Sequence, residues 1–169
     1  MQPIGYMILL KQEFTRMISQ YQGILHKVCR IYRDTPEDRE DLFQEMVFQL
    51  WKAYPSYRKE AKVTTWMYKI VLSTAVAKYR KKRLATTSIS STEIAVAESA
   101  DHPERERLYR AISTLSEAEK AIVTLYLDDY SYEEIAEMLG VTTNYVGVRL
   151  HRIKEKLIHL LNPRTHEPR

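Results

Sequence analysis

Residues 131–157 contain two helix signals separated by a glycine. Ser131 is followed three residues later by Glu134, a capping box in which each side chain satisfies a backbone N–H group of the first helical turn. Gly140 can take the left-handed conformation that ends this first helix, and Thr142 can cap the next one. The segment therefore predicts a helix, a tight turn and a second helix.

The second helix is expected to have one buried face and one outward face. Apolar residues recur along it at spacings of four, three and four, and Ala136 on the first helix is small enough for a close crossing. The predicted buried residues are Val146, Leu150, Ile153 and Leu157. The predicted outward residues are Thr143, Asn144, Gly147, Val148, His151 and Arg152. This pattern is typical of a helix-turn-helix unit, whose second helix meets the major groove of DNA.

An alternative for the same residues is an ordinary amphipathic helix whose basic side chains serve only solubility. The distribution of charge favours DNA binding instead, because the two helices carry opposite signs. The acidic residues around the first helix are Asp128, Asp129, Glu133, Glu134 and Glu137. The basic residues of the second are Arg149, His151, Arg152, Lys154 and Lys156.

The composition limits the fold to one medium or two small helical domains. The chain has 169 residues, 44% hydrophobic content and only four glycines, and few of its stretches alternate in the manner of strands bounded by turns. We predict an all-α protein of two small helical domains joined by a flexible linker, the C-terminal one a helix-turn-helix. A net charge of +4 modestly suits a polyanionic partner.

Residue patterns that would indicate other kinds of site are sparse. Cys29 is the one cysteine and cannot form an internal disulfide, and the five histidines lack metal-ligand spacing, so neither a metal nor a cofactor is predicted. The apolar run MILL at residues 7–10 is far too short for a signal peptide or a membrane span, so we expect no membrane insertion and a cytoplasmic location. No carboxylates or histidines converge as a nucleic-acid enzyme would require, and no enzyme is predicted.

A change in composition separates two predicted domains. Residues 84–102 have a Ser/Thr-rich first half and three acidic residues but no lysine or arginine, which is typical of a linker. We predict domains at residues 1–83 and 104–169 with a linker at 84–103. Helices in the first domain are expected over about residues 10–33, from Thr35-Pro36 to before Pro55, and over about 64–83. Their predicted buried residues are Phe14, Met17, Ile18, Tyr21, Leu25, Val28, Leu42, Met46 and Leu50.

Aromatic and basic residues are interleaved between positions 54 and 83. Together they offer stacking surfaces beside a phosphate-binding track, which favours a single-stranded nucleic acid. The alternative is that Trp66, Ile70 and Ala77 are core residues at helical spacing and that the lysines form a solvated face. The aromatic residues are Tyr54, Tyr57, Trp66, Tyr68 and Tyr79, and the cations include Arg58, Lys59, Lys62, Lys69, Lys78, Arg80, Lys81, Lys82 and Arg83.

Three motifs in this order and spacing resemble those of the extracytoplasmic-function sigma factors, the small two-domain class of bacterial RNA polymerase sigma subunits. EDLFQEMVFQLW at residues 40–51 resembles the segment that binds the polymerase clamp helices. TTWMYKIVLSTAVAKYRKKR at residues 64–83 resembles the segment that opens and reads the minus-ten element. Residues 131–157 resemble the reader of the minus-thirty-five element. With the linker, the resemblance spans nearly the whole chain.

The resemblance implies core RNA polymerase and promoter DNA, both duplex and melted, as partners, and it leaves open an anti-sigma factor. The implied polymerase-binding residues are Asp41, Leu42, Phe43, Gln44, Glu45 and Gln49, where Leu42, Phe43 and Trp51 supply apolar contact or core. The implied minus-ten residues are Tyr57, Arg58, Lys62, Trp66, Tyr68, Lys69, Arg80 and Lys81. Trp66 and Tyr68 are expected to form the wall of a pocket for an unstacked base, or Trp66 to lie buried behind that pocket.

For the minus-thirty-five element, the second helix of the helix-turn-helix supplies all the implied residues. Thr143 and Asn144 are expected to donate backbone N–H groups to a phosphate. Val148, His151 and Arg152 are expected to reach base edges, with Arg152 contacting guanine. The implied phosphate-neutralising residues are Arg149, Lys154 and Lys156.

Five positions depart from the family pattern. Lys59 stands where glycine is common, so the turn that captures a base is expected to differ in shape. Gly147 occupies a position that is often basic, which suggests a close approach of DNA. The other departures are Val63 for an aromatic residue, Ser73 for asparagine and Ala77 for an acidic residue. In the family the linker threads the channel that nascent RNA enters, so its acidic residues either mimic RNA or belong to a plain tether.

A rival function is a stand-alone repressor or activator whose N-terminal domain dimerises or senses a signal. Such a protein would form a stable homodimer and bind duplex DNA tightly without polymerase. The polar, acidic surface expected at residues 41–49 argues against this function.

Overall fold

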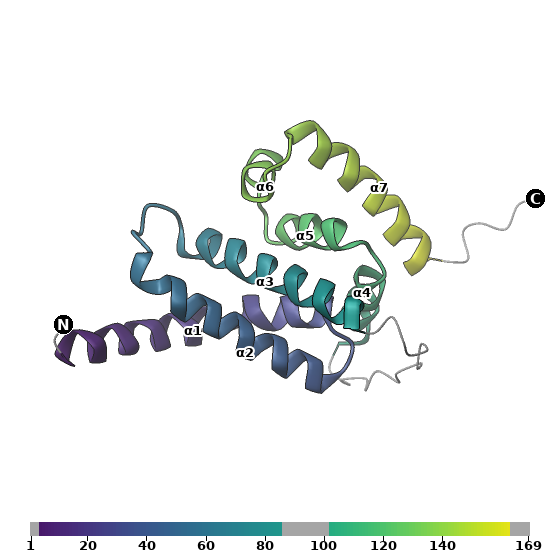
Figure 1. The fold of residues 1–169 in the computed structure, drawn as a ribbon. Helices are drawn as coiled ribbons and strands as arrows, with labels where there is room; N and C mark the ends of the chain where they lie inside the picture. Colours follow the sequence, from purple (N-terminus) through teal and green to yellow (C-terminus); the bar gives the residue numbers. More distant parts are fainter. Residues whose placement is uncertain (1–3, 86–101, 163–169) are drawn as a thin grey trace, which may run out of the picture. The chain divides into compact units, whose positions relative to one another are not determined.

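The computed structural model describes residues 4–85 and 102–162, and every regular element within these two ranges is a helix (Figure 1). In chain order the helices are α1 (Ile4–Tyr32), α2 (Pro36–Ala53), the 3-10 turn η1 (Tyr54–Ser56), α3 (Val63–Ala85), α4 (Pro103–Ser113), α5 (Glu117–Tyr126), α6 (Tyr132–Leu139) and α7 (Thr143–Leu161). The prediction of an all-α fold is confirmed. Most of the predicted linker lies outside the described residues.

The Cα positions divide the chain into two compact units. Unit 1 holds residues 4–29 and 35–85 of the described chain, with α2, α3 and most of α1. Unit 2 holds α4 to α7 together with residues 30–34. Each unit has its own apolar core.

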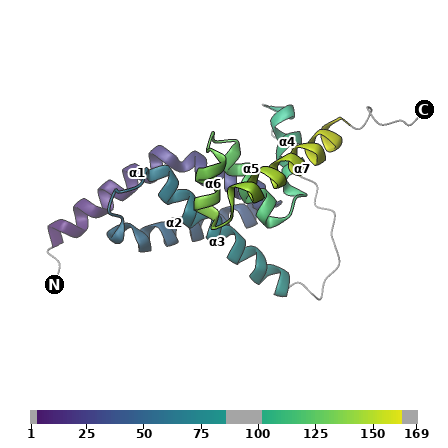
Figure 2. The same ribbon diagram turned by 90° about the horizontal axis from the view of Figure 1, so that it is seen from above.

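In unit 1, α2 begins as the sequence predicted. The Thr35 side chain accepts a hydrogen bond from the Asp38 backbone N–H, and Pro36 occupies the first helical position. Helix α1 begins at Ile4 rather than near Leu10, and the apolar side chains of its first turns are exposed, so they give no burial pattern in the sequence. In both views these turns extend past the neighbouring helices of the unit (Figures 1 and 2).

The core of unit 1 lies among its three helices. Helices α2 and α3 run side by side, joined through η1 and a short loop (Figures 1 and 2). Of the residues predicted to be buried, Ile18 and Tyr21 are only half-buried and the rest are confirmed. The core residues are Phe14, Met17, Ile24, Leu25, Val28, Cys29, Leu42, Met46, Leu50, Met67, Tyr68, Val71, Leu72 and Ala75.

In unit 2, α7 is the element that packs against all the others, namely α4, α5 and α6. The predicted stripe of Val146, Leu150, Ile153 and Leu157 is buried, as expected from its spacing. The stripe fixes which face of α7 points outward, because the two faces of a helix are set by one periodicity.

The turn between α6 and α7 has the geometry that the sequence predicted. The Ser131–Glu134 capping box is formed in both directions, and Gly140 ends α6 with φ 68° and ψ 36°. The Thr142 side chain then caps α7 by accepting from the Tyr145 backbone N–H. The C-terminal helix-turn-helix is therefore confirmed.

Candidate nucleic-acid and polymerase interfaces

The outward face of α7 forms a shallow hollow with the start of α6. Six of its seven lining residues are those predicted to face outward, and the seventh is Tyr132 on α6. The lining residues are Tyr132, Thr143, Asn144, Gly147, Val148, His151 and Arg152. The sequence pattern therefore predicted the position of this face on α7, but it missed the tyrosine. The sequence could have indicated Tyr132, because it directly follows the cap residue Ser131 at the start of α6, the helix that packs on α7.

The first turn of α7 contributes hydrogen-bond donors to this hollow. The N–H groups of a first helical turn have no acceptor within the helix, and they carry the positive end of its dipole. Thr143 and Asn144 occupy that turn and are exposed. An anionic oxygen can therefore be bound at this end of the outward face.

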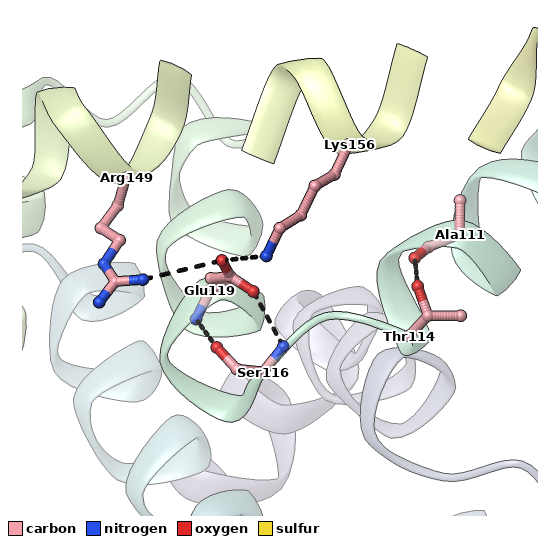
Figure 3. A network of polar contacts seen from close by, with 6 residues as sticks. All are labelled: Ala111, Thr114, Ser116, Glu119, Arg149 and Lys156. Carbon is pink, nitrogen blue, oxygen red and sulfur yellow. Dashed lines mark hydrogen bonds and ion pairs between the residues drawn. The ribbon is translucent and has the colours of Figure 1, made fainter. Parts of the chain in front are cut away.

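Three basic residues predicted to neutralise phosphates instead contact their own unit. Lys156 Nζ lies 2.7 Å from Glu119 Oε1, and Arg149 Nη1 lies 4.0 Å from the same oxygen (Figure 3). Lys154 Nζ donates to the Tyr126 hydroxyl at 3.0 Å and sits 4.5 Å from the centre of its ring. These contacts direct the three side chains toward α5, so their role at phosphates stays a prediction.

Glu119 is the carboxylate around which part of this network forms. It is buried and closes a capping box with Ser116 at the start of α5 (Figure 3). Burial acts to raise the pKa of the Glu119 carboxyl, but hydrogen bonds with Lys156 and Ser116 outweigh it and lower the pKa below its usual value. The charged carboxylate therefore ties α7 to α5.

In unit 1, a chain of aromatic rings surrounds the start of α3. Tyr57 stacks on Trp66 with centroids 4.6 Å apart and an interplanar angle of 28°. Tyr54 meets Trp66 edge-on at 6.3 Å and meets Phe14 at 5.3 Å. Trp66 is therefore held among other rings, with Tyr57 covering one of its faces. This arrangement favours the alternative in which Trp66 supports the pocket from behind.

The loop between η1 and α3 is closed by Tyr57. Its hydroxyl donates to the Ala61 carbonyl oxygen at 2.8 Å, across the turn that contains Lys59. Lys59 has φ 60°, in the left-handed region that favours glycine. The lysine thus occupies a backbone conformation that glycine adopts more easily, and the expected difference in turn shape from the family stays a prediction.

Tyr68, predicted as a wall of the base pocket, lies instead in the core. Its relative exposure is 0%, and its hydroxyl accepts a hydrogen bond from Lys27 Nζ at 3.2 Å. A side chain with no exposed surface cannot stack on a base. Its spacing from the buried residues Val71, Leu72 and Ala75 was the signal that would have placed it on the inner face.

The basic residues predicted for the minus-ten element are all exposed. They are Arg58, Lys62, Lys69, Arg80 and Lys81. Lys81 also lines an open groove between α2 and α3, whose other residues are Glu45, Gln49, Ser73, Thr74, Ala77 and Lys78. In this groove Glu45 and Gln49, which are predicted to bind polymerase, lie next to Lys81, which is predicted to bind DNA.

The polymerase face predicted on α2 is largely accessible. Asp41 and Gln44 are exposed, while Glu45 and Gln49 are half-buried and joined by a hydrogen bond of 2.8 Å. Phe43 is half-buried and stacks on His26 at 4.7 Å. Leu42 is 0% exposed, so of the two predicted roles, apolar contact or core, it has the second.

An apolar residue on the same face was missed. Phe48 is 57% exposed, and it follows Gln44 and Glu45 by four and three residues, so it shares their face of α2. The sequence could have indicated this residue, because Phe48 is an aromatic residue outside the buried stripe of Leu42, Met46 and Leu50. A large exposed aromatic ring among polar residues is typical of a protein-binding surface.

No helix within residues 4–85 and 102–162 is long and apolar enough to cross a bilayer. In the same ranges, no three histidine, cysteine, aspartate or glutamate side chains are grouped so that they could hold a metal ion.

Two protein-family models match the chain, one in each half of the sequence. The family described as Sigma-70 region 2 matches residues 17–85, and the one described as Sigma-70, region 4 matches residues 105–157. Together they account for most of the chain in the order that the motifs predicted.

Curated relatives match over most of their length. The ECF RNA polymerase sigma factor SigM of Mycobacterium tuberculosis is 27% identical over 150 residues, which cover 88% of this chain and 76% of that protein. The ECF RNA polymerase sigma-E factor of Escherichia coli K12 is 29% identical over 174 aligned positions, which cover 90% of this chain and 88% of that protein.

A solved structure has the same fold. It is the sigma factor RpoE of Bartonella quintana in complex with the anti-sigma factor NepR, with a TM-score of 0.75 at 18% identity, covering 89% of this chain and 98% of that one. Sigma-70 regions 2 and 4 in this order, with relatives of this kind, identify the chain as a member of the extracytoplasmic-function sigma factors, the RNA polymerase subunits that act in transcription initiation.

Proposed function

We propose that this sigma factor directs core RNA polymerase to specific promoters by dividing the work between residues 1–83 and residues 104–169. The first segment would bind the polymerase and the melted minus-ten element, and the second would bind the minus-thirty-five duplex. The observation that carries this proposal is that regions 2 and 4 match separate compact units in this order. Residues 84–103 then join two DNA-binding parts, and their acidic side chains serve as a tether or an RNA mimic.

Polymerase binding is assigned to the exposed face of α2. Asp41, Gln44, Glu45 and Gln49 supply polar contacts, and Phe48 supplies an apolar anchor on the same face. Phe43 is held by His26 at the edge of this face. An acidic patch around one aromatic ring suits a basic partner surface with an apolar pocket.

Recognition of the melted strand is assigned to the loop before α3. Tyr57 is the proposed stacking surface for an unstacked base, with Trp66 supporting its ring from behind. Arg58, Lys62, Lys69, Arg80 and Lys81 are the proposed phosphate contacts, because all five are exposed. Tyr68 is left out of this set because it is buried.

Recognition of the upstream duplex is assigned to the hollow on α7. Thr143 and Asn144 position a phosphate, while Val148, His151 and Arg152 meet base edges. Arg149, Lys154 and Lys156 keep their proposed phosphate role only where the DNA can compete with their contacts to Glu119 and Tyr126.

The proposed partners follow from these three assigned surfaces. They are core RNA polymerase, promoter DNA in duplex and melted form, and an anti-sigma factor of the kind seen bound to the structural relative. The protein would contribute binding and no bond-making chemistry, so it is not an enzyme. It would act in the cytoplasm, where the polymerase meets chromosomal DNA.

The decisive test is transcription by purified components. Core polymerase alone and core polymerase with this chain would transcribe fragmented genomic DNA, and the RNA 5′ ends would be sequenced. We expect a set of start sites that requires the chain and shares two upstream elements. Start sites that do not change when the chain is added would overturn the proposal.

A further inference from the structure

The hollow on unit 2 contains an apolar corner that the recognition residues do not explain. Gly147 forms its floor, the Tyr132 ring forms one wall, and Val148, which is 46% exposed, lies beside them. The polar residues Thr143, Asn144, His151 and Arg152 line the same hollow.

The packing of the free protein does not require a glycine at this position. A methyl group added at Gly147 would lie 3.7 Å from Tyr132 Cε2, which is ordinary van der Waals contact. Gly147 is also inside α7, where glycine is less favourable than alanine. Neither the fold nor helix propensity therefore accounts for the missing side chain, and the space above it is left open.

The chemistry of the major groove supplies an apolar group of matching size. Among the four bases, thymine alone presents a methyl group there, and small apolar side chains recognise it by contact. An apolar corner flanked by polar side chains suits one methyl group surrounded by hydrogen-bonding base edges. A phosphate is a poorer fit directly over Gly147, because the nearest atoms there are ring carbons of Tyr132.

We propose that the corner formed by Tyr132, Gly147 and Val148 binds the C5-methyl group of one thymine in the upstream promoter element. These three residues are then specificity determinants that act by contact and shape. The inference rests on the proposed function, in which α7 reads duplex DNA, and it adds a base preference at one position.

The test uses core polymerase with the full chain and a duplex selected from a random library for binding. Each thymine of the selected upstream element is replaced singly by deoxyuridine, which removes only the C5-methyl group. We expect one replacement to weaken binding about three- to fourfold, the size expected for one buried methyl-sized group. The other replacements are expected to have little effect.

Variants then connect this methyl group to the corner. Gly147→Ala fills the space, so the preference for thymine over deoxyuridine at that position is expected to fall to about one. Val148→Ala removes a wall and is expected to reduce the preference in the same direction. Tyr132→Phe keeps the ring, so this variant is expected to retain the preference for thymine. Ile158→Ala, on an exposed part of α7 outside the hollow, is the matched control and is expected to retain it too.

The failures of the two proposals are distinguishable. If the selection enriches no upstream sequence, the assignment of α7 as a duplex reader is wrong. If a sequence is enriched but it contains no thymine, or no deoxyuridine replacement weakens binding, the reader stands and the methyl-binding corner is wrong. A preference that persists in Gly147→Ala also overturns the corner, because the methyl group would then be bound elsewhere.

Discussion

Lys59 adopts a backbone conformation that costs energy for any residue with a side chain. Its φ of 60° lies in the left-handed region, where an L-residue is less stable by about 1–2 kcal/mol. The loop accepts this strain because Tyr57 closes it through the bond to the Ala61 carbonyl oxygen. A lysine in this position also adds a cation next to Arg58 and Lys62, where we propose that the melted strand is bound.

Substitution of Lys59 separates the strain from the charge. Lys59→Gly should leave the free energy of unfolding of unit 1 unchanged or raise it by up to about 1 kcal/mol, since relief of strain exceeds the added freedom of the unfolded chain. Lys59→Val should lower it by about 1 kcal/mol or more, because a β-branched residue tolerates positive φ poorly. Urea unfolding followed by tryptophan fluorescence measures this, because both tryptophans, Trp51 and Trp66, lie in unit 1. If Lys59→Val unfolds at the same urea concentration as the parent, the strain argument is wrong.

Arg152 and Lys156 lie on the same helix but are expected to respond differently to truncation. Arg152→Ala should reduce discrimination among upstream elements by about 1–3 kcal/mol, because a bidentate contact to guanine would be lost. Lys156→Ala should reduce the stability of unit 2, because Glu119 would lose its 2.7 Å partner, with little change in base preference. Competition binding with duplexes that differ at single positions measures the first effect, and thermal unfolding measures the second. An unchanged base preference in Arg152→Ala would remove its proposed role.

At the scale of the element, one buried carboxylate links α5 to α7 in addition to the apolar stripe of α7. Glu119 holds the start of α5 through its capping box and holds α7 through Lys156 (Figure 3). The other capping box, at Ser131 and Glu134, has the same local geometry but is exposed. The two glutamates therefore allow a comparison between a buried and an exposed version of one motif.

The network predicts how the stability of unit 2 depends on pH. The folded pKa of Glu119 is lowered below the ordinary value of about 4.5, so its contribution is present above that value and is lost as the pH falls through the folded pKa. Glu119→Gln should therefore destabilise unit 2 at pH 7 by about 1–3 kcal/mol and reduce the loss of stability on acidification. Amide hydrogen exchange of α5 and α7 from pH 7 down to pH 3 measures both effects.

Glu134→Gln is the matched control for this experiment. Its effect should stay below about 1 kcal/mol, because an exposed capping contact is weaker and solvent-screened. Equal effects of the two substitutions would show that burial and the contact with Lys156 add nothing to the capping box.

The same elements show which parts of the fold and sites could be predicted from sequence. Local rules predicted the Thr35, Ser131 and Thr142 caps and the Gly140 turn, because each depends on neighbours within a few residues. Contacts between distant residues were not predictable in this way. The Tyr68 hydroxyl accepts from Lys27, which lies 41 residues away in the chain, and Lys156 is directed to Glu119, which lies 37 residues away. Periodicity gives the face on which a residue lies, but the partner on that face depends on the tertiary fold.

At the scale of the whole molecule, the binding surfaces proposed for the two units differ in chemical kind. Unit 1 presents polar and acidic residues around Phe48 on α2 and exposed cations around the start and end of α3. Unit 2 presents the outward face of α7. Their separate roles can be tested by removing one surface at a time.

Asp41→Lys combined with Phe48→Ala should remove polymerase binding and leave both units folded. Both residues are exposed and lie outside the core, so far-ultraviolet circular dichroism and the unfolding midpoint should not change. The reversed charge opposes a basic partner surface, and loss of the exposed ring removes the proposed apolar anchor. Co-purification with core polymerase and transcription from a dependent promoter should both fall at least tenfold. Lys52→Ala, exposed near the end of the same helix, is the control and should retain both activities. If the double variant still co-purifies with core polymerase, this face of α2 is not the docking surface, and the polymerase contact must be sought elsewhere on unit 1.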